Sequence, residues 1–116
     1  GHAIEAATDF AIPHGIAVTI GMDMANDAAV RLGVGTPAYY RRAHPVLKAN
    51  YAGFEDHPVP LERFLSAIAK DKKNTGSDSV TLILPDSGGR VFKDTYPNDD
   101  VFAAMCAEYL ENGRTA

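Results

Sequence analysis

The sequence predicts a mainly α, multi-helical domain with one small β-hairpin. Over most of the chain, apolar residues recur at spacings of three and four, which is typical of helices. Only residues 80–84 alternate with period two, as a strand does, and turn-forming residues follow at 85–89. The sequence has no strand–helix–strand unit and no G-x-G-x-x-G run, so we expect no dinucleotide site in this chain.

Length and composition limit the classes of protein that fit. The 116 residues are enough for a single domain over 1–116. The net charge of −4 argues against a nucleic-acid partner, and no apolar run approaches the roughly 20 residues that span a membrane. The single cysteine, Cys106, excludes an internal disulfide framework and predicts a reducing compartment, the cytoplasm. Cys106 shares an apolar stripe with Phe102 and Leu110, which predicts a buried thiol.

The first third of the chain predicts a short helical start and a long helix. Residues 1–5 have helical character, and a loop punctuated by Pro13 and Gly15 carries His14. Residues 16–32 are apolar nearly all round, so we expect a helix buried on most sides, ended by the glycines that follow. Its polar residues share one narrow stripe at a spacing of four: Thr19, Asp23, Asp27 and Arg31.

The middle of the chain predicts two more helices. Thr36 and Pro37 are a typical helix start, and we expect Pro45 to break or kink the helix over residues 38–51. A loop separates it from an amphipathic helix over residues 61–70.

The last part of the chain predicts the return strand and a final helix. The return strand is expected over residues 90–93, which makes a hairpin with residues 80–84. Asn98 or Asp99 is expected to cap the last helix. The apolar stripe of that helix is Val101, Phe102, Met105, Tyr109 and Leu110.

Two histidines are candidate functional residues. His2 and His14 are twelve positions apart, and neutral imidazole is the commonest protein ligand of transition metals. On residue type alone, the simpler interpretation is a surface-loop histidine at position 14 and a frayed or tag-derived one at position 2. The surrounding sequence favours a functional role.

Two sequence blocks resemble the 3-dehydroquinate synthase family, the sugar-phosphate cyclases. The run G-H-A-I-E-A at residues 1–6, followed by H-G at residues 14–15, is similar to the family's G-H-A-I-E and H-G-E-A-V segments at the same spacing. Residues 71–74, D-K-K-N, and the strand after them resemble the family's D-K-K segment and hairpin. The resemblance is strong over residues 1–24 and 61–84. It implies a fragment of the C-terminal metal- and substrate-binding domain, without the N-terminal NAD-binding domain.

The resemblance implies a role for four residues. His14 takes the place of a zinc ligand, and His2 that of an active-site histidine that contacts the substrate's phosphate region. Lys72 takes the place of a lysine that binds the substrate's anionic groups, with Lys73 as the alternative. Both lysines also fit a simpler role, since cations near a helix C-terminus stabilise it through the helix dipole. The family's other two metal ligands, a histidine and a glutamate, would lie upstream of this chain.

The resemblance also implies a reaction. The family uses NAD and zinc or another divalent metal to eliminate phosphate from a phosphorylated sugar acid and close a ring, within the shikimate pathway of aromatic amino acid biosynthesis. We expect the full-length protein to be a homodimer that acts on a small molecule, with no nucleic-acid or membrane partner. The isolated fragment is expected to be inactive. His14 is expected to be accessible at a cleft, with Lys72 or Lys73 pointing toward the same cleft.

One departure from the family pattern keeps alternatives open. The family's H-G-E reads His14-Gly15-Ile16 here, which removes a carboxylate next to the metal ligand. A divergent sugar-phosphate cyclase is one interpretation. The equivalent domain of an iron-type polyol or alcohol dehydrogenase, which also carries a P-H-G segment, is another. A catalytically inert helical module is the third.

Overall fold

The computed structural model describes residues 2–71, 79–86, 88–97 and 99–115, and it confirms a mainly α fold with one hairpin. The chain order of the elements is α1 (His2–Ala7), α2 (His14–Arg31), α3 (Pro37–Asn50), α4 (Leu61–Asp71), β1 (Ser79–Pro85), β2 (Val91–Pro97), α5 (Asp100–Glu111) and a 3₁₀ turn (Gly113–Thr115). In the described part of the chain, no helix has both the length and the apolar character needed to cross a membrane.

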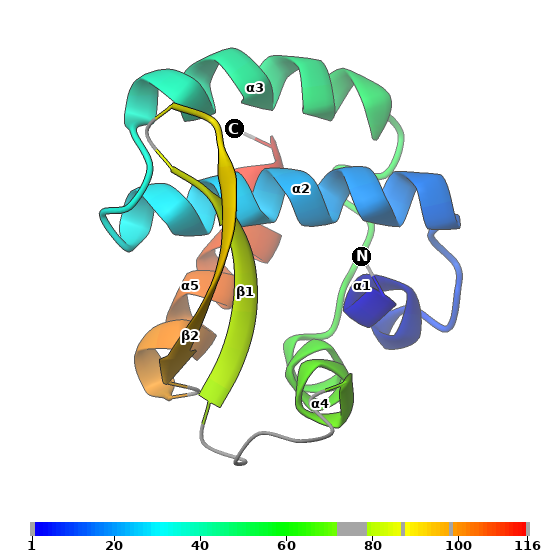
Figure 1. Ribbon diagram of the computed structural model, residues 1–116. Helices are drawn as coiled ribbons and strands as arrows, with labels where there is room; N and C mark the ends of the chain where they lie inside the picture. Colours follow the sequence, from blue (N-terminus) through cyan, green and yellow to red (C-terminus); the bar gives the residue numbers. More distant parts are fainter. Residues whose placement is uncertain (1, 72–78, 87, 98, 116) are drawn as a thin grey trace.

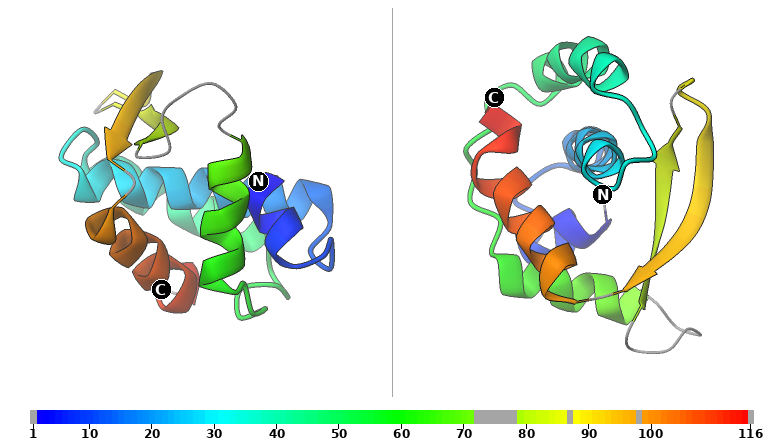
Figure 2. Two further views of the ribbon diagram at one scale, coloured as in Figure 1. Left: turned by 90° about the horizontal axis from the view of Figure 1, so that it is seen from below. Right: turned by 90° about the vertical axis from the view of Figure 1, so that its left-hand side faces the viewer.

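The long helix α2 lies at the centre of the molecule, as its apolar sequence predicts. Figure 1 shows α3 running alongside α2, the hairpin crossing it, and α1 and α4 near its N-terminal end. A view along α2 shows α3, the hairpin, α4 and α5 arranged around it (Figure 2). The core is built from residues of every layer, including Ile4, Ile20, Tyr51, Phe102 and Tyr109.

The start of α2 differs from the sequence prediction. His14 is the first residue of the helix rather than part of a loop, and Pro13 occupies the N-cap position. The backbone N–H of Ala17 donates to the Pro13 carbonyl oxygen at 2.8 Å, which closes the first helical turn. A proline just before a helix fits here because its missing N–H would have no partner in the helix.

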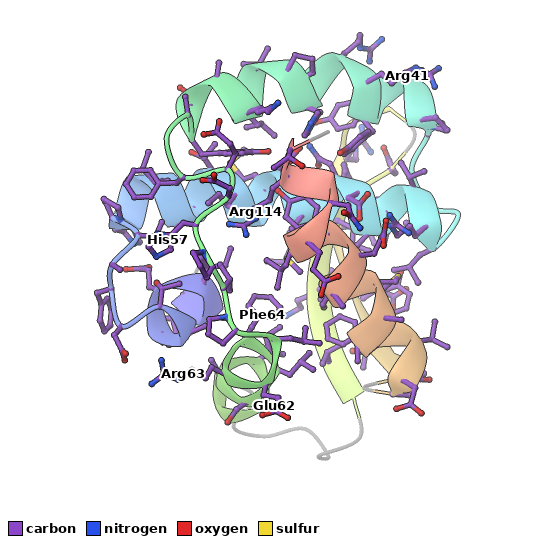
Figure 3. The ribbon with its side chains drawn as sticks, turned by 180° about the vertical axis from the view of Figure 1, so that it is seen from behind. Arg41, His57, Glu62, Arg63, Phe64 and Arg114 are labelled. Carbon is purple, nitrogen blue, oxygen red and sulfur yellow. The ribbon has the colours of Figure 1, made fainter. Side chains whose placement is uncertain are left out.

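Of the two predicted effects of Pro45, a break in the helix is wrong, since α3 continues through Pro45 to Asn50. Pro45 cannot donate a hydrogen bond to the carbonyl oxygen of Arg41. Both residues are exposed, and Figure 3 shows Arg41 on the outer side of α3, where water can take the place of the missing donor. The predicted cap at the start of α3 is present, with the N–H of Tyr39 donating to Thr36 Oγ1 at 3.3 Å.

The hairpin is longer on its second strand than the sequence predicts. β2 pairs with β1 over its whole length in antiparallel register, from Val91 opposite Pro85 to Pro97 opposite Ser79. β2 is largely exposed, so its sequence lacks the alternation that a buried face imposes. At the turn, Gly89 has φ +84°, and Asp86 Oδ1 accepts hydrogen bonds from the N–H groups of Gly88 and Arg90.

The last helix is largely as predicted. Asp99 is its cap, with Oδ1 accepting from the N–H of Phe102 at 3.1 Å, whereas Asn98 lies outside the described residues. Cys106 is buried, and burial raises its thiol pKa to about 12. Val101 is the exception to the predicted stripe, because it is 67% exposed in the first turn of α5.

Candidate functional site

The junction between α1 and α2 brings a glutamate and a histidine together. The Nδ1 atom of His14 lies 2.8 Å from Oε1 of Glu5. The histidine side chain is 77% exposed, whereas the glutamate side chain is 11% exposed. The ring therefore has one nitrogen held by the protein and the opposite side open to solvent.

A tight turn makes this contact possible. The backbone N–H of Phe10 donates to the Glu5 carbonyl oxygen at 2.8 Å, and Thr8 Oγ1 donates to the Ile4 carbonyl oxygen at 2.9 Å. Asp9 and Phe10 have positive φ angles of 52° and 63°, a conformation that side chains other than glycine adopt rarely. The chain thus reverses immediately after α1, and the first turn of α2 lies against the helix that carries Glu5.

His2 lies elsewhere, beside two apolar grooves. The first, about 440 Å³, is lined by residues of α1, α2, α4, α5 and β1, among them Phe64, Ile68 and Met105. The second, about 590 Å³, lies between α2, α3 and the hairpin. His2, Gly21, Ala25 and Ile83 line both grooves, so His2 sits where they adjoin.

The two candidate histidines lie on different helices. His2 begins α1, whereas His14 begins α2 and lies seven residues, or roughly 10 Å along the helix axis, before Gly21, which lines both grooves together with His2. The predicted accessibility of His14 is confirmed, but His14 lines neither of the two grooves. Lys72 and Lys73 lie outside the described residues, so their predicted orientation stays a prediction.

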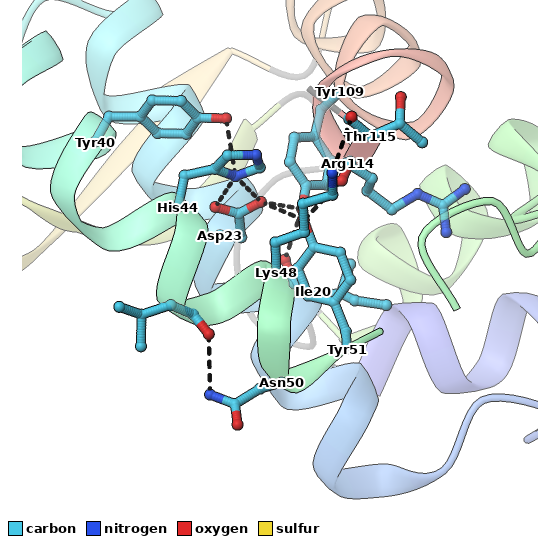
Figure 4. Close-up of polar contacts among 11 residues, drawn as sticks. Ile20, Asp23, Tyr40, His44, Lys48, Asn50, Tyr51, Tyr109, Arg114 and Thr115 are labelled. Atoms are coloured by element: carbon cyan, nitrogen blue, oxygen red, sulfur yellow. Dashed lines mark hydrogen bonds and ion pairs between the residues drawn. The ribbon is translucent and has the colours of Figure 1, made fainter. Parts of the chain in front are cut away.

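A buried polar cluster is the feature that sequence reasoning missed (Figure 4). The carboxylate of Asp23 is fully buried and accepts hydrogen bonds from His44 Nδ1 at 2.8 Å, Tyr109 Oη at 2.8 Å and Tyr51 Oη at 2.9 Å. Burial, and then the Asp23 charge, raises the pKa of Tyr51 and Tyr109, and raises that of Tyr40 to about 12. The signal in the sequence was Asp23 itself, a carboxylate in a helix expected to be buried on most sides.

The residues present fit one metal ligand rather than a complete metal site. A histidine that binds a metal through one ring nitrogen usually donates the other N–H to a carboxylate or carbonyl oxygen, as His14 can donate to Glu5. In the described segments, no group of three or more His, Cys, Asp or Glu side chains is arranged to hold a metal ion. A catalytic zinc ion usually takes three protein ligands, so this part of the chain holds at most a share of such a site.

Comparison with known proteins agrees with the two sequence blocks. Residues 1–74 match the family described as 3-dehydroquinate synthase C-terminal. The chain is 33% identical to a 3-dehydroquinate synthase of Rhizobium meliloti (strain 1021), over 94% of this chain and 31% of the relative. It is 40% identical to that of Helicobacter pylori (strain G27), over 73% of this chain and 25% of the relative.

A third relative also matches nearly the whole chain. The 3-dehydroquinate synthase of Agrobacterium fabrum (strain C58 / ATCC 33970) is 37% identical over 95% of this chain and 30% of the relative. The chain thus spans between a quarter and a third of the length of these relatives. No solved structure matches it significantly. Because the family match covers residues 1–74, which include both His2 and His14, the chain belongs to the 3-dehydroquinate synthase C-terminal family.

Proposed function

We propose that this chain is the C-terminal, metal- and substrate-binding part of a 3-dehydroquinate synthase-like lyase. Such an enzyme eliminates phosphate from a phosphorylated sugar acid and closes the product into a ring, within the shikimate pathway in the cytoplasm. The observation that carries the proposal is the family match over residues 1–74, which contain His2 and His14. The relatives called 3-dehydroquinate synthase support the same activity for the full-length protein.

His14 is the residue of this chain that would hold zinc or another divalent metal. Such a metal, when bound, acts as a Lewis acid on a substrate oxygen. The support for this role is the exposed ring at the start of α2, with Nδ1 against the Glu5 carboxylate. The remaining ligands would come from residues of the full-length protein outside these 116.

His2 and the two lysines would bind the negatively charged groups of the substrate. The imidazole of His2 would donate a hydrogen bond to the phosphate and stabilise it as it departs. Lys72, or Lys73 as the alternative, would add a positive charge for the substrate's anionic groups. NAD would be bound by the N-terminal domain of the full-length protein, which we propose to be a homodimer.

The apolar grooves support a site completed by other parts of the full-length protein. The residues lining the two grooves are mostly apolar, with few charged side chains among them. A phosphorylated sugar acid needs several polar partners, and buried anions need paired charges. The proposal therefore places His2 at the edge of the substrate site and the opposite wall on the remainder of the enzyme.

Phosphate release by the full-length protein tests this proposal. With NAD and a divalent metal, the natural substrate of the relatives should release phosphate, and a strong chelator should abolish the release. His14→Ala should lower the rate by at least about a hundredfold, as expected for loss of a catalytic metal or of the groups that hold it. His57→Ala is the matched control and should leave the rate unchanged.

Two results would contradict the proposal. One is a rate of phosphate release that His14→Ala does not change. The other is accumulation of NADH from a polyol or alcohol without phosphate release, which is the behaviour of the dehydrogenase alternative.

A further inference from the structure

The hydrogen bond between Glu5 and His14 has a consequence for the chemistry of the imidazole ring. We propose that Glu5 is a positioning residue that fixes His14 in the Nδ1–H tautomer and so presents Nε2, with its lone pair, to solvent. The assignment of Nε2 as the metal-binding atom rests on the proposed function. The assignment of the tautomer rests on the geometry alone.

The proton assignment follows from what each group can donate. An ionised carboxylate only accepts hydrogen bonds, so the 2.8 Å contact between Glu5 Oε1 and His14 Nδ1 requires the proton to be on Nδ1. A neutral imidazole carries one N–H, which leaves the lone pair on Nε2. The side chain of Ile16, two residues after His14, has no polar atom and packs against the hydrophobic core, so it offers no competing acceptor. Among the described residues, Glu5 is the acidic group that contacts the ring.

Glu5 can impose this state because its own position is fixed. It lies on α1 between two buried residues, Ile4 and Ala7, which are 1% and 0% exposed. Its backbone carbonyl accepts from the N–H of Phe10, which ties it to the turn before α2. His14 is anchored through the backbone of an 18-residue helix. The hydrogen bond therefore joins two rigid elements and limits the directions in which the exposed ring can point.

A tautomer measurement on this chain tests the proposal. Long-range ¹H–¹⁵N NMR spectra identify the protonated nitrogen of each histidine at a pH well above the usual histidine pKa of about 6.5. We expect His14 to be mainly Nδ1–H, whereas the exposed form of the side chain in water favours Nε2–H. In Glu5→Ala the ratio of Nδ1–H to Nε2–H should fall about tenfold, which is the loss of one hydrogen bond to a charged group.

Two further variants separate positioning from folding. Glu5→Gln keeps an acceptor oxygen at the same place, so it should retain much of the Nδ1–H preference. Glu62→Ala removes a glutamate that Figure 3 shows on the outer side of α4, so it should leave the His14 spectrum unchanged. Circular dichroism checks that each variant keeps its helices. If Glu5→Ala does not fold, the wild-type and Glu5→Gln spectra test the proposed tautomer.

The proposal is overturned if wild-type His14 is mainly Nε2–H, or if folded Glu5→Ala keeps the wild-type ratio. Titration with zinc then examines the metal role separately. Zinc should shift the Nε2 resonance of His14 and leave Nδ1 protonated. Loss of the Nδ1 proton on addition of millimolar zinc would count against Nε2 as the metal-binding atom and leave the positioning role of Glu5 standing.

Discussion

Asp23 shows how one residue can connect the parts of this molecule. Its carboxylate is completely buried, and burying a charge is costly unless hydrogen bonds replace the lost water. Three donors do so: His44 on α3, Tyr51 just after α3, and Tyr109 on α5. These donors are 21, 28 and 86 positions away in the chain, so no local pattern in the sequence could indicate that they meet.

Replacing Asp23 with asparagine should destabilise the fold strongly. The amide has one acceptor oxygen in place of two, and its NH₂ group would face the hydroxyl and imidazole donors. We expect a loss of about 2–4 kcal/mol in the free energy of unfolding, measured by urea denaturation. Asp56→Asn, at an exposed site, is the control and should change stability by less than about 0.5 kcal/mol. A similar small effect for both variants would contradict a structural role for the cluster.

The tyrosines around Asp23 predict instability at alkaline pH. Burial, and then the Asp23 charge, raises the pKa of Tyr109 and Tyr51 above the usual value of 10. The unfolded chain therefore releases these protons at lower pH than the folded chain. Their contribution to stability is complete below pH 10 and is lost as the pH rises above it.

Urea denaturation at several pH values between 8 and about 11 measures this effect. The free energy of unfolding should fall above pH 10, and Tyr109→Phe should make the decline less steep. Tyr39→Phe is the comparison, because Tyr39 is partly exposed and is not among the hydrogen-bond donors to Asp23. Equal slopes in wild type and Tyr109→Phe would show that the buried tyrosines do not control the alkaline transition.

At the scale of the elements, the sequence predicted most helices because their signals are local. The capping Thr36 and Asp99 and the apolar stripe of α5 are set by neighbouring residues. The errors arose where the tertiary surroundings of a residue affect its structure more than its sequence neighbours do. β2 is exposed and so lacks an alternating pattern, and α3 passes through Pro45 because the unpaired carbonyl faces solvent. His14 is the first residue of α2 and contacts Glu5. Both features depend on a turn whose two residues have unusual, positive φ angles.

The proline inside α3 predicts a stabilising substitution. Pro45→Ala would restore the N–H that donates to the Arg41 carbonyl and remove a residue that disfavours helices by about 3 kcal/mol. The more flexible unfolded chain offsets up to about 1 kcal/mol of this gain. We expect a net increase of about 1–2 kcal/mol in the free energy of unfolding, seen as a higher melting temperature. Pro37→Ala is the matched control, since proline is favoured at the first helical position and its loss should not stabilise.

At the scale of the whole molecule, α2 is surrounded by other elements, yet one side of the fold remains open and apolar. Met22, Val46, Ile83 and Val91 line the groove between α2, α3 and the hairpin, and all are at least half exposed. Contiguous exposed apolar surface usually marks a contact with another part of a protein or a partner. Fold class and family could be predicted from periodicity and two motif blocks. This groove could not, because it forms from three elements that are distant in sequence.

The open grooves and the single candidate ligand predict how the isolated chain binds zinc and NAD. His14 is the one residue of the expected ligand set in this chain, and the described segments hold no cluster of three ligating side chains. One imidazole cannot compete with water for zinc at useful affinity, since catalytic sites usually supply three protein ligands. The sequence has no glycine-rich phosphate loop for NAD. We therefore expect weak zinc binding, no tight NAD binding and no turnover.

Isothermal titration calorimetry of the 116-residue chain with zinc, and separately with NAD, measures both affinities. His14→Ala should remove most of the weak zinc signal, while His57→Ala, the control, should leave it unchanged. Submicromolar binding of zinc would mean that this chain holds more of a metal site than His14 and Glu5. Submicromolar binding of NAD would mean that this chain holds part of the cofactor site.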